Sequence, residues 1–211
     1  MNKPFPSQST LNFAAVSFAI QYYKDELHST HGFKYGVLPN STTAISKSQV
    51  IRDWVTHFSV ARSFTGFGQL SAEQRESSYG KIHDLIWMHG PKDDNESVVT
   101  RAIRVENTLR SELKIGTSLL SVTTKLLWLI DRESIIYDGI VRKKLGTPEG
   151  DYKAYCEKWE SEFRIMSSGI EAAALTLSKS AHLFPEDWDL QRDCRNPWFS
   201  QRIFDTLHWL S

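Results

Sequence analysis

Two residues in the segment from 123 to 146 could perform chemistry together, namely Lys125 and Asp138. Lys125 lies within the strongly apolar run TTKLLWLI. A lysine beside apolar side chains can be partly neutral, and a neutral amine is a nucleophile. An aspartate close by can orient that amine or stabilise positive charge. This pair is the best chemical clue in the chain, and it requires elements that bring the two residues together.

Each of the two residues also has a purely structural interpretation. The expected helix around Lys125 is apolar on nearly every side, so the lysine could extend to the surface or form an ion pair. Its position alone favours that interpretation. Asp138 stands at the start of an expected helix, where aspartate is a favoured N-cap. Capping does not exclude catalysis, because a rigid, ionised aspartate is what stabilises a developing cation.

Apolar residues recur at helical spacing along nearly the whole chain, which predicts an all-α fold. Capping candidates are Thr10, Ser46 with Gln49, and Ser71 with Gln74. No strand or β-hairpin signal is found, and residues 29–45 are expected to form a loop. The first expected helix starts at the capping candidate Thr10. The others cover about 46–61, 71–90, 96–113, 118–130, 138–146, 150–181 and 199–210, and Gly169 is a candidate break in the helix at 150–181.

We expect residues 1–211 to form a single α-helical domain, an irregular multi-helix globule with room for two lobes and an active-site cleft between them. The formal net charge of +0 gives no global basic field, so binding of nucleic acid needs a local patch. No signal peptide or run of about 20 apolar residues occurs, which predicts a soluble, cytoplasmic protein without membrane contact.

Metal ligands are not indicated by the sequence. Cys156 and Cys194 match no metal-ligand spacing and are expected to be reduced, buried thiols. His28 and His31 are three positions apart, but no second pair or acidic partner completes a zinc site.

The segment from Leu113 to Leu145 resembles the helix-hairpin-helix superfamily of DNA glycosylases, most of all its 8-oxoguanine DNA glycosylase branch. The likeness rests on TKLLWLI, a short connector and IIYDGIVRKKL. In that branch a lysine near the start of the second hairpin helix is the nucleophile, and an aspartate assists it. The resemblance therefore implies these roles for Lys125 and Asp138, within a hairpin and catalytic segment at 113–146.

The resemblance also implies that Leu113 to Val122 form a hairpin whose backbone amides hold a DNA phosphate. Where the family usually has two glycines this chain has one, flanked by hydroxyls that can also contact phosphate. The spacing from lysine to aspartate is shorter than the family norm, and Ile140 replaces a frequent histidine. The DNA-binding residues of this hairpin would be Gly116, Thr117, Ser118 and Ser121, and the basic cluster that includes Arg142 and Lys143 is a further candidate for phosphate contact.

Positive charge at Arg142, Lys143 and Lys144 has an alternative interpretation, because basic residues also complement the dipole of a helix C-terminus.

A glycosylase must flip its target base and hold it between flat side chains. Aromatic and histidine candidates for such a pocket are Phe64, Trp198, Phe204 and His208. Individually, each aromatic ring is more often part of a core. The last two lie on the final helix, which closes the base pocket in the resembling family.

The leading hypothesis is a DNA glycosylase, monomeric and acting on DNA, for base-excision repair or defence against foreign DNA. It would use a lysine Schiff base assisted by aspartate, with AP lyase activity as a further step and no metal or organic cofactor. One alternative is a non-catalytic helical module that binds DNA or a protein. The other is an unrelated helical protein whose resemblance is due to chance.

Overall fold

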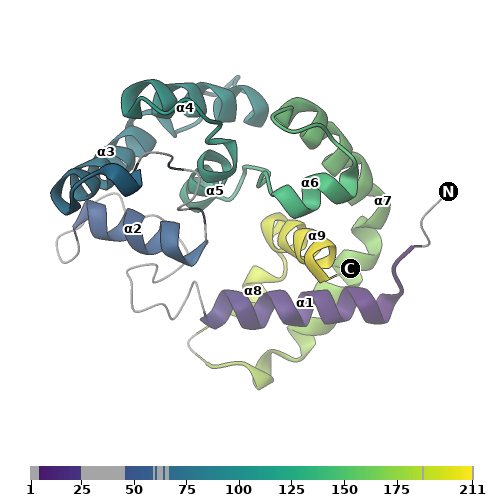
Figure 1. Ribbon diagram of the computed structural model, residues 1–211. Coiled ribbons are helices and arrows are strands. Elements are labelled where there is room, and N and C mark those ends of the chain that lie inside the picture. Colours follow the sequence, from purple (N-terminus) through teal and green to yellow (C-terminus); the bar gives the residue numbers. More distant parts are fainter. Residues whose placement is uncertain are drawn as a thin grey trace. The chain divides into compact units, whose positions relative to one another are not determined.

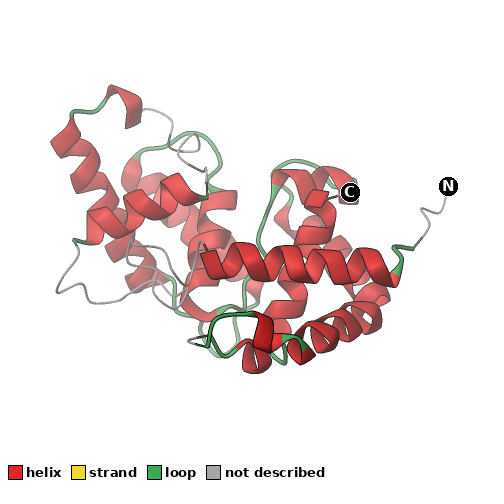
Figure 2. Cartoon of the chain, turned by 90° about the horizontal axis from the view of Figure 1, so that it is seen from below, coloured by secondary structure: helices red, strands yellow, loops and turns green. Residues whose placement is uncertain are grey.

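The computed structural model describes residues 5–24, 46–58, 60, 64, 67–186 and 188–210. Among these residues every regular element is a helix and no strand occurs (Figure 1, Figure 2). The all-α prediction is therefore confirmed for the described part of the chain. The expected loop at 29–45, with His28 and His31, lies outside the described residues.

The chain divides into two compact units. Unit 1 comprises Met1–Lys24, Ile140–Pro148 and Ala154–Ser211, and unit 2 comprises Asp25–Gly139 and Glu149–Lys153. The chain passes from unit 2 into unit 1 directly after Asp138 and Gly139. Lys125 and Asp138 thus belong to the same unit.

Unit 2 is a succession of helices in which each packs against the next along the chain. Its elements are α2 (Lys47–His57), η3 (Phe67–Gln69), α3 (Ala72–His89), α4 (Val98–Leu113) and α5 (Leu120–Asp131). The N-caps predicted at Ser46 and Ser71 are confirmed. The hydroxyl of Ser46 accepts the amide of Gln49, whose own side chain donates to Asp53 rather than closing a box, and Ser71 with Gln74 forms a complete capping box. Ser97 caps α4 in the same way, through the amide of Thr100.

Unit 1 is built around the packing of α1 (Gln8–Tyr22) against α9 (Pro197–Leu210), which lie side by side in Figure 1. Phe18 of α1 meets Phe199 of α9 edge-on, with ring centroids 5.0 Å apart. Apart from their first residues, α6 (Gly139–Leu145) and α7 (Tyr152–Lys179) also belong to this unit, together with η4 (Ala181–Leu183) and α8 (Leu190–Asp193).

The first helix begins earlier than the sequence predicts. Ser7, rather than Thr10, is the N-cap, and its hydroxyl accepts the backbone amide of Thr10 at 3.3 Å. Both residues carry a hydroxyl that can cap a helix, and the apolar periodicity that follows does not distinguish between them.

The predicted break at Gly169 is wrong, because α7 continues through it without interruption. The missing side chain serves packing instead. A Cβ atom at Gly169 would lie 2.7 Å from Cδ1 of Leu11, and the carbonyl of Gly169 accepts a hydrogen bond from Gln8 at 3.1 Å. The glycine lets α1 approach the backbone of α7, which is a long-range reason that local sequence does not reveal.

Two glycines of unit 2 give a matched test of these packing arguments. No heavy atom lies within 4 Å of a Cβ built at Gly80, inside α3. Gly80→Ala should therefore raise the free energy of unfolding by about 0.5–1 kcal/mol, since alanine favours the helix. At Gly90, which follows α3, a Cβ would collide with the carbonyl oxygen of Ile86. Gly90→Ala should lower that free energy by about 1–3 kcal/mol.

Denaturant unfolding followed by circular dichroism measures both values. Equal stability of the two variants would show that the short distance between Gly90 and the carbonyl of Ile86 does not exclude a side chain at this position.

Candidate active site

The two helices of the expected hairpin, α4 and α5, are joined by the turn at residues 114–119. The turn begins with Lys114 in the left-handed conformation, at φ 55° and ψ 41°. The amide of Ile115 then bonds to the carbonyl of Arg110 at 2.9 Å, and the guanidinium of Arg110 donates to the carbonyl of Gly116 at 2.8 Å. These bonds close the C-terminus of α4 and fix the start of the turn.

Four of the residues expected to bind DNA lie in this turn and at the start of α5. Gly116, Thr117 and Ser118 are exposed, and Ser121 is half-buried in the first turn of α5. The hydroxyl of Ser118 donates to the carboxylate of Glu106 at 2.6 Å. The hydroxyl proton of Ser118 is therefore already used in a hydrogen bond within the protein.

Lys125 lies in the middle of a helix that is buried on nearly every side. Only 8% of its surface is exposed, and most other residues of α5 are buried as well. The expectation of a buried helix around this lysine is thus confirmed. A charged amine in such surroundings is costly unless it is paired.

The connector that follows α5 is itself buried, from Ser134 to Tyr137. Its backbone is held at several points within unit 2. The amide of Tyr137 donates to the hydroxyl of Thr124 at 3.0 Å, and the hydroxyl of Tyr152 donates to the carbonyl of Ile135 at 2.6 Å. The amide of Gly150 donates to the hydroxyl of Tyr137 at 2.8 Å. The connector is therefore fixed along α5 by side chains as well as by burial.

The bond between Thr124 and Tyr137 joins the two candidate residues' segments directly. Thr124 precedes Lys125, and Tyr137 precedes Asp138. Each candidate residue thus stands one position beyond a hydrogen bond that ties α5 to the connector. Asp138 is half-buried and immediately precedes α6, as expected.

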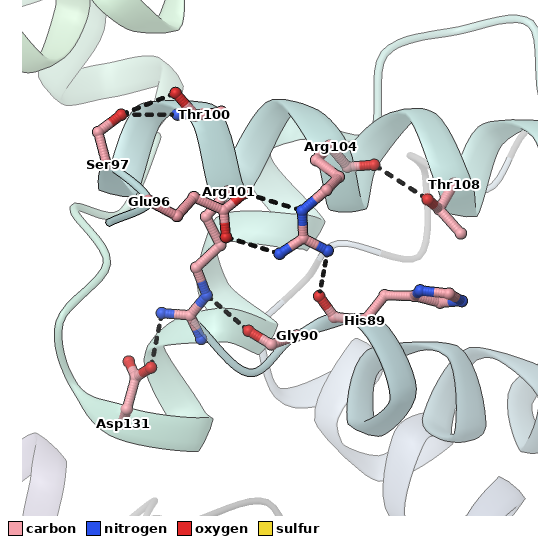
Figure 3. Close-up of polar contacts among 9 residues, drawn as sticks. All are labelled: His89, Gly90, Glu96, Ser97, Thr100, Arg101, Arg104, Thr108 and Asp131. Carbon is pink, nitrogen blue, oxygen red and sulfur yellow. Dashed lines mark hydrogen bonds and ion pairs between the residues drawn. The ribbon is translucent and has the colours of Figure 1, made fainter. Parts of the chain in front are cut away.

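A second cluster fixes the other end of α5 (Figure 3). Arg101 of α4 is fully buried, pairs with Asp131 of α5 at 2.6 Å and donates to the carbonyl of Gly90 at 2.6 Å. Arg104 reaches the carbonyl of His89 at 2.8 Å. The cluster connects the C-terminus of α3, the first half of α4 and the C-terminus of α5.

Glu96 completes this cluster as a bidentate partner of Arg104, with bonds of 2.8 and 2.7 Å. The hydrogen bonds that Arg104 donates to Glu96 lower the pKa of Glu96 and raise the pKa of Arg104. The paired charges hold the loop before α4 to its first turns.

The basic residues of α6 lie in its last turn. Arg142 is half-buried and donates to the carbonyl of Thr147 at 2.8 Å, whereas Lys143 is exposed. Arg142 thus satisfies a carbonyl just beyond the end of α6, in agreement with the structural interpretation of this cluster. Both residues belong to unit 1, and their contact with DNA stays a prediction.

The candidates for the base pocket are divided between the units. Phe64, in unit 2, is buried and stacks on Phe67 at 5.0 Å. Phe204, in unit 1, is fully buried and meets Trp159 at 4.9 Å. These two rings fill the cores of their units, so neither presents a free face to a base in this conformation.

Trp198 and His208, both in unit 1, are half-buried and keep exposed surface. A ring nitrogen of His208 bonds to the carbonyl of Phe204 at 2.9 Å, which fixes the orientation of the imidazole.

Three residues that position α5 were missed in the sequence: Arg101, Glu106 and Thr124. A signal for the two charged residues exists. Both occupy places in the apolar face of α4, which would otherwise be continuous; its buried residues are Arg101, Ala102, Val105, Glu106 and Leu109. A charge within an apolar face indicates a buried polar contact. No comparable signal marks Thr124.

Among the described residues, no group of three or more histidine, cysteine, aspartate or glutamate side chains could hold a metal ion. None of the helices in that part of the chain combines the length and apolarity needed to cross a bilayer. Cys156 and Cys194 are buried thiols that form no disulfide, and burial raises the pKa of Cys194 to about 12.

The bond between Thr124 and Tyr137 can be tested by hydrogen exchange. Thr124→Val keeps the shape of the side chain but removes the acceptor, so the amide of Tyr137 should lose its protection against exchange. Thr124→Ser keeps the hydroxyl and should keep that protection. The valine variant should also lose about 1–3 kcal/mol of stability, because a buried amide is left without a partner. Equal exchange in the two variants would contradict the role assigned to Thr124.

Comparison of the chain with protein-family models, with curated proteins and with solved structures finds no match.

Proposed function

We propose that this chain is a DNA glycosylase of the helix-hairpin-helix type, which removes a damaged or modified base from DNA through a lysine Schiff base. One observation carries the proposal. The hydrogen bond from the amide of Tyr137 to the hydroxyl of Thr124 ties the segments of Lys125 and Asp138 together at adjacent positions. A nearly buried amine and a half-buried carboxylate on two tied segments are what this chemistry needs.

In the proposed reaction, the amine of Lys125 attacks C1′ of the flipped nucleotide. The glycosidic bond breaks, and its electron pair leaves with the base. Asp138 accepts the proton released by the amine, from where it passes to the departing base. The C1′–O4′ bond then opens, O4′ takes up a proton, and the nitrogen and C1′ form an imine. Hydrolysis of the imine by water restores the lysine.

Strand cleavage can follow from the same intermediate. The imine acidifies the proton on C2′, and removal of that proton expels the 3′ phosphate by β-elimination. This step gives AP lyase activity without any metal or organic cofactor.

Asp138 has a second part in the proposed reaction, since positive charge develops on the sugar as the base departs. A carboxylate that is already fixed stabilises such charge without reorganisation. The connector before Asp138 is buried and held by Thr124, Tyr152 and Gly150, which supports a fixed aspartate.

Contact with DNA is proposed for the turn at 114–119 and for α6. Gly116, Thr117 and Ser118 are exposed residues from which the backbone would meet a phosphate, and Lys143 offers an exposed charge. The net charge of +0 means that affinity must come from such local contacts. With few phosphates neutralised, the salt dependence of binding should be shallow.

A second candidate function is a non-catalytic module that binds DNA or a protein. The burial of Lys125 also supports this function, because a structural ion pair needs a lysine held within the fold. Base release separates the two candidates, since only the enzyme frees a base from DNA.

The assigned nucleophile can be tested by borohydride trapping on duplexes that carry oxidised, deaminated or phage-type modified bases. Lys125→Gln should abolish trapping, because the amide cannot form an imine. Asp138→Asn should slow it by about 10²- to 10⁴-fold, as expected for loss of a proton acceptor. Lys92→Gln is the control, since Lys92 lies in the same unit, is exposed and pairs with Glu133 at 2.8 Å.

Full trapping of the Lys125→Gln protein would exclude Lys125 as the nucleophile. Base release without trapping in that variant would point to water activated by Asp138. Salt-dependent DNA binding by the wild type without release of any base would favour the non-catalytic module.

A further inference from the structure

Glu106 of α4 places a buried carboxylate against the turn that leads into α5. Only 8% of the residue is exposed. One of its oxygens accepts the backbone amide of Leu119 at 2.8 Å and the hydroxyl of Ser118 at 2.6 Å. Taking a carboxylate out of water is costly, so an acid in this place must perform a task that an apolar residue could not.

The task is visible at the N-terminus of α5. The N-cap residue is Leu119, whose side chain has no hydrogen-bond acceptor and makes no capping bond. Helices normally begin at a residue whose own oxygen caps the first turn. Here the capping oxygen comes from Glu106 on the neighbouring helix, and its negative charge also suits the positive end of the helix dipole.

This internal anion occupies a position that a phosphate would otherwise favour, because helix N-termini attract anions. It takes up the amide of Leu119, and the hydroxyl of Ser118 in turn accepts the amide of Leu120 at 3.2 Å. The amide of Leu119 and the hydroxyl of Ser118 are therefore already bonded within the protein, and in the proposed function the phosphate meets the exposed part of the turn at Gly116 and Thr117.

We infer that Glu106 is a positioning residue for DNA binding: it caps α5 from α4 and holds the turn at 114–119 in the shape that meets a DNA phosphate. The inference rests on the proposed function. Its consequence is a pair of opposing effects. The capping bonds hold the turn ready for DNA and strengthen binding, whereas the negative charge repels the phosphate and weakens binding.

Three variants of the full chain separate the two effects. Glu106→Gln removes the charge but keeps an oxygen that can accept both bonds. Glu106→Ala removes the charge and the acceptor. Glu112→Gln is the matched control, because it removes the same charge from the same helix. Glu112 is exposed and pairs with Lys81 at 2.8 Å.

The measurement is the affinity for a duplex that carries one tetrahydrofuran abasic-site analogue, over a range of salt concentrations. Glu106→Gln should bind about threefold more tightly than wild type at low salt, and more tightly than the Glu112→Gln control, because a nearby charge has been removed. Glu106→Ala should bind about fivefold more weakly than Glu106→Gln, a difference that corresponds to the free energy of one helix cap.

Two results would overturn the inference. One is a Glu106→Gln protein that binds no more tightly than Glu112→Gln, and the other is a Glu106→Ala protein that folds and binds like Glu106→Gln. If Glu106→Ala does not fold, the comparison of the two glutamine variants decides alone. A wild type that is trapped on DNA while the Glu106 variants match the control overturns this inference but not the proposed function. A wild type that neither binds nor is trapped overturns both.

Discussion

The hydrogen bond between the amide of Tyr137 and the hydroxyl of Thr124 is the constraint on which the candidate site depends. It fixes the connector after α5 along that helix, so that Lys125 and Asp138 follow directly from two bonded residues. Burial excludes water from the connector, and Tyr152 adds a second bond to it. Without this constraint an aspartate at the start of α6 would have no fixed relation to a lysine within α5.

The helix that carries Lys125 is held at both ends by α4. Near the start of α4, Arg101 pairs with Asp131 at the C-terminus of α5. Further along, Glu106 caps the N-terminus of α5. The cation meets the negative end of the α5 dipole and the anion meets its positive end, so both contacts agree with the helix electrostatics. Lys125, in the middle of α5, is therefore held in place by Arg101 and Glu106, two charged residues that have no role in the proposed reaction steps.

Local sequence predicted what depends on local physics. Helical periodicity gave the all-α class, and the hydroxyls of Ser46 and Ser71 marked real helix starts. The buried helix around Lys125 followed from its apolar composition. The role of Gly169 could not be predicted, since it depends on the distant Leu11. Thr124 was missed for a similar reason, because a threonine in a helix does not reveal which backbone amide its hydroxyl will meet.

Peptide mass mapping of the wild-type protein, after borohydride reduction on DNA, identifies the residue that forms the imine. The sugar remnant should be attached to the peptide that contains Lys125, and fragmentation should place it on the nitrogen of that side chain. A remnant on any other lysine or on the N-terminal amine would contradict the role of Lys125, as would base release that leaves no covalent adduct.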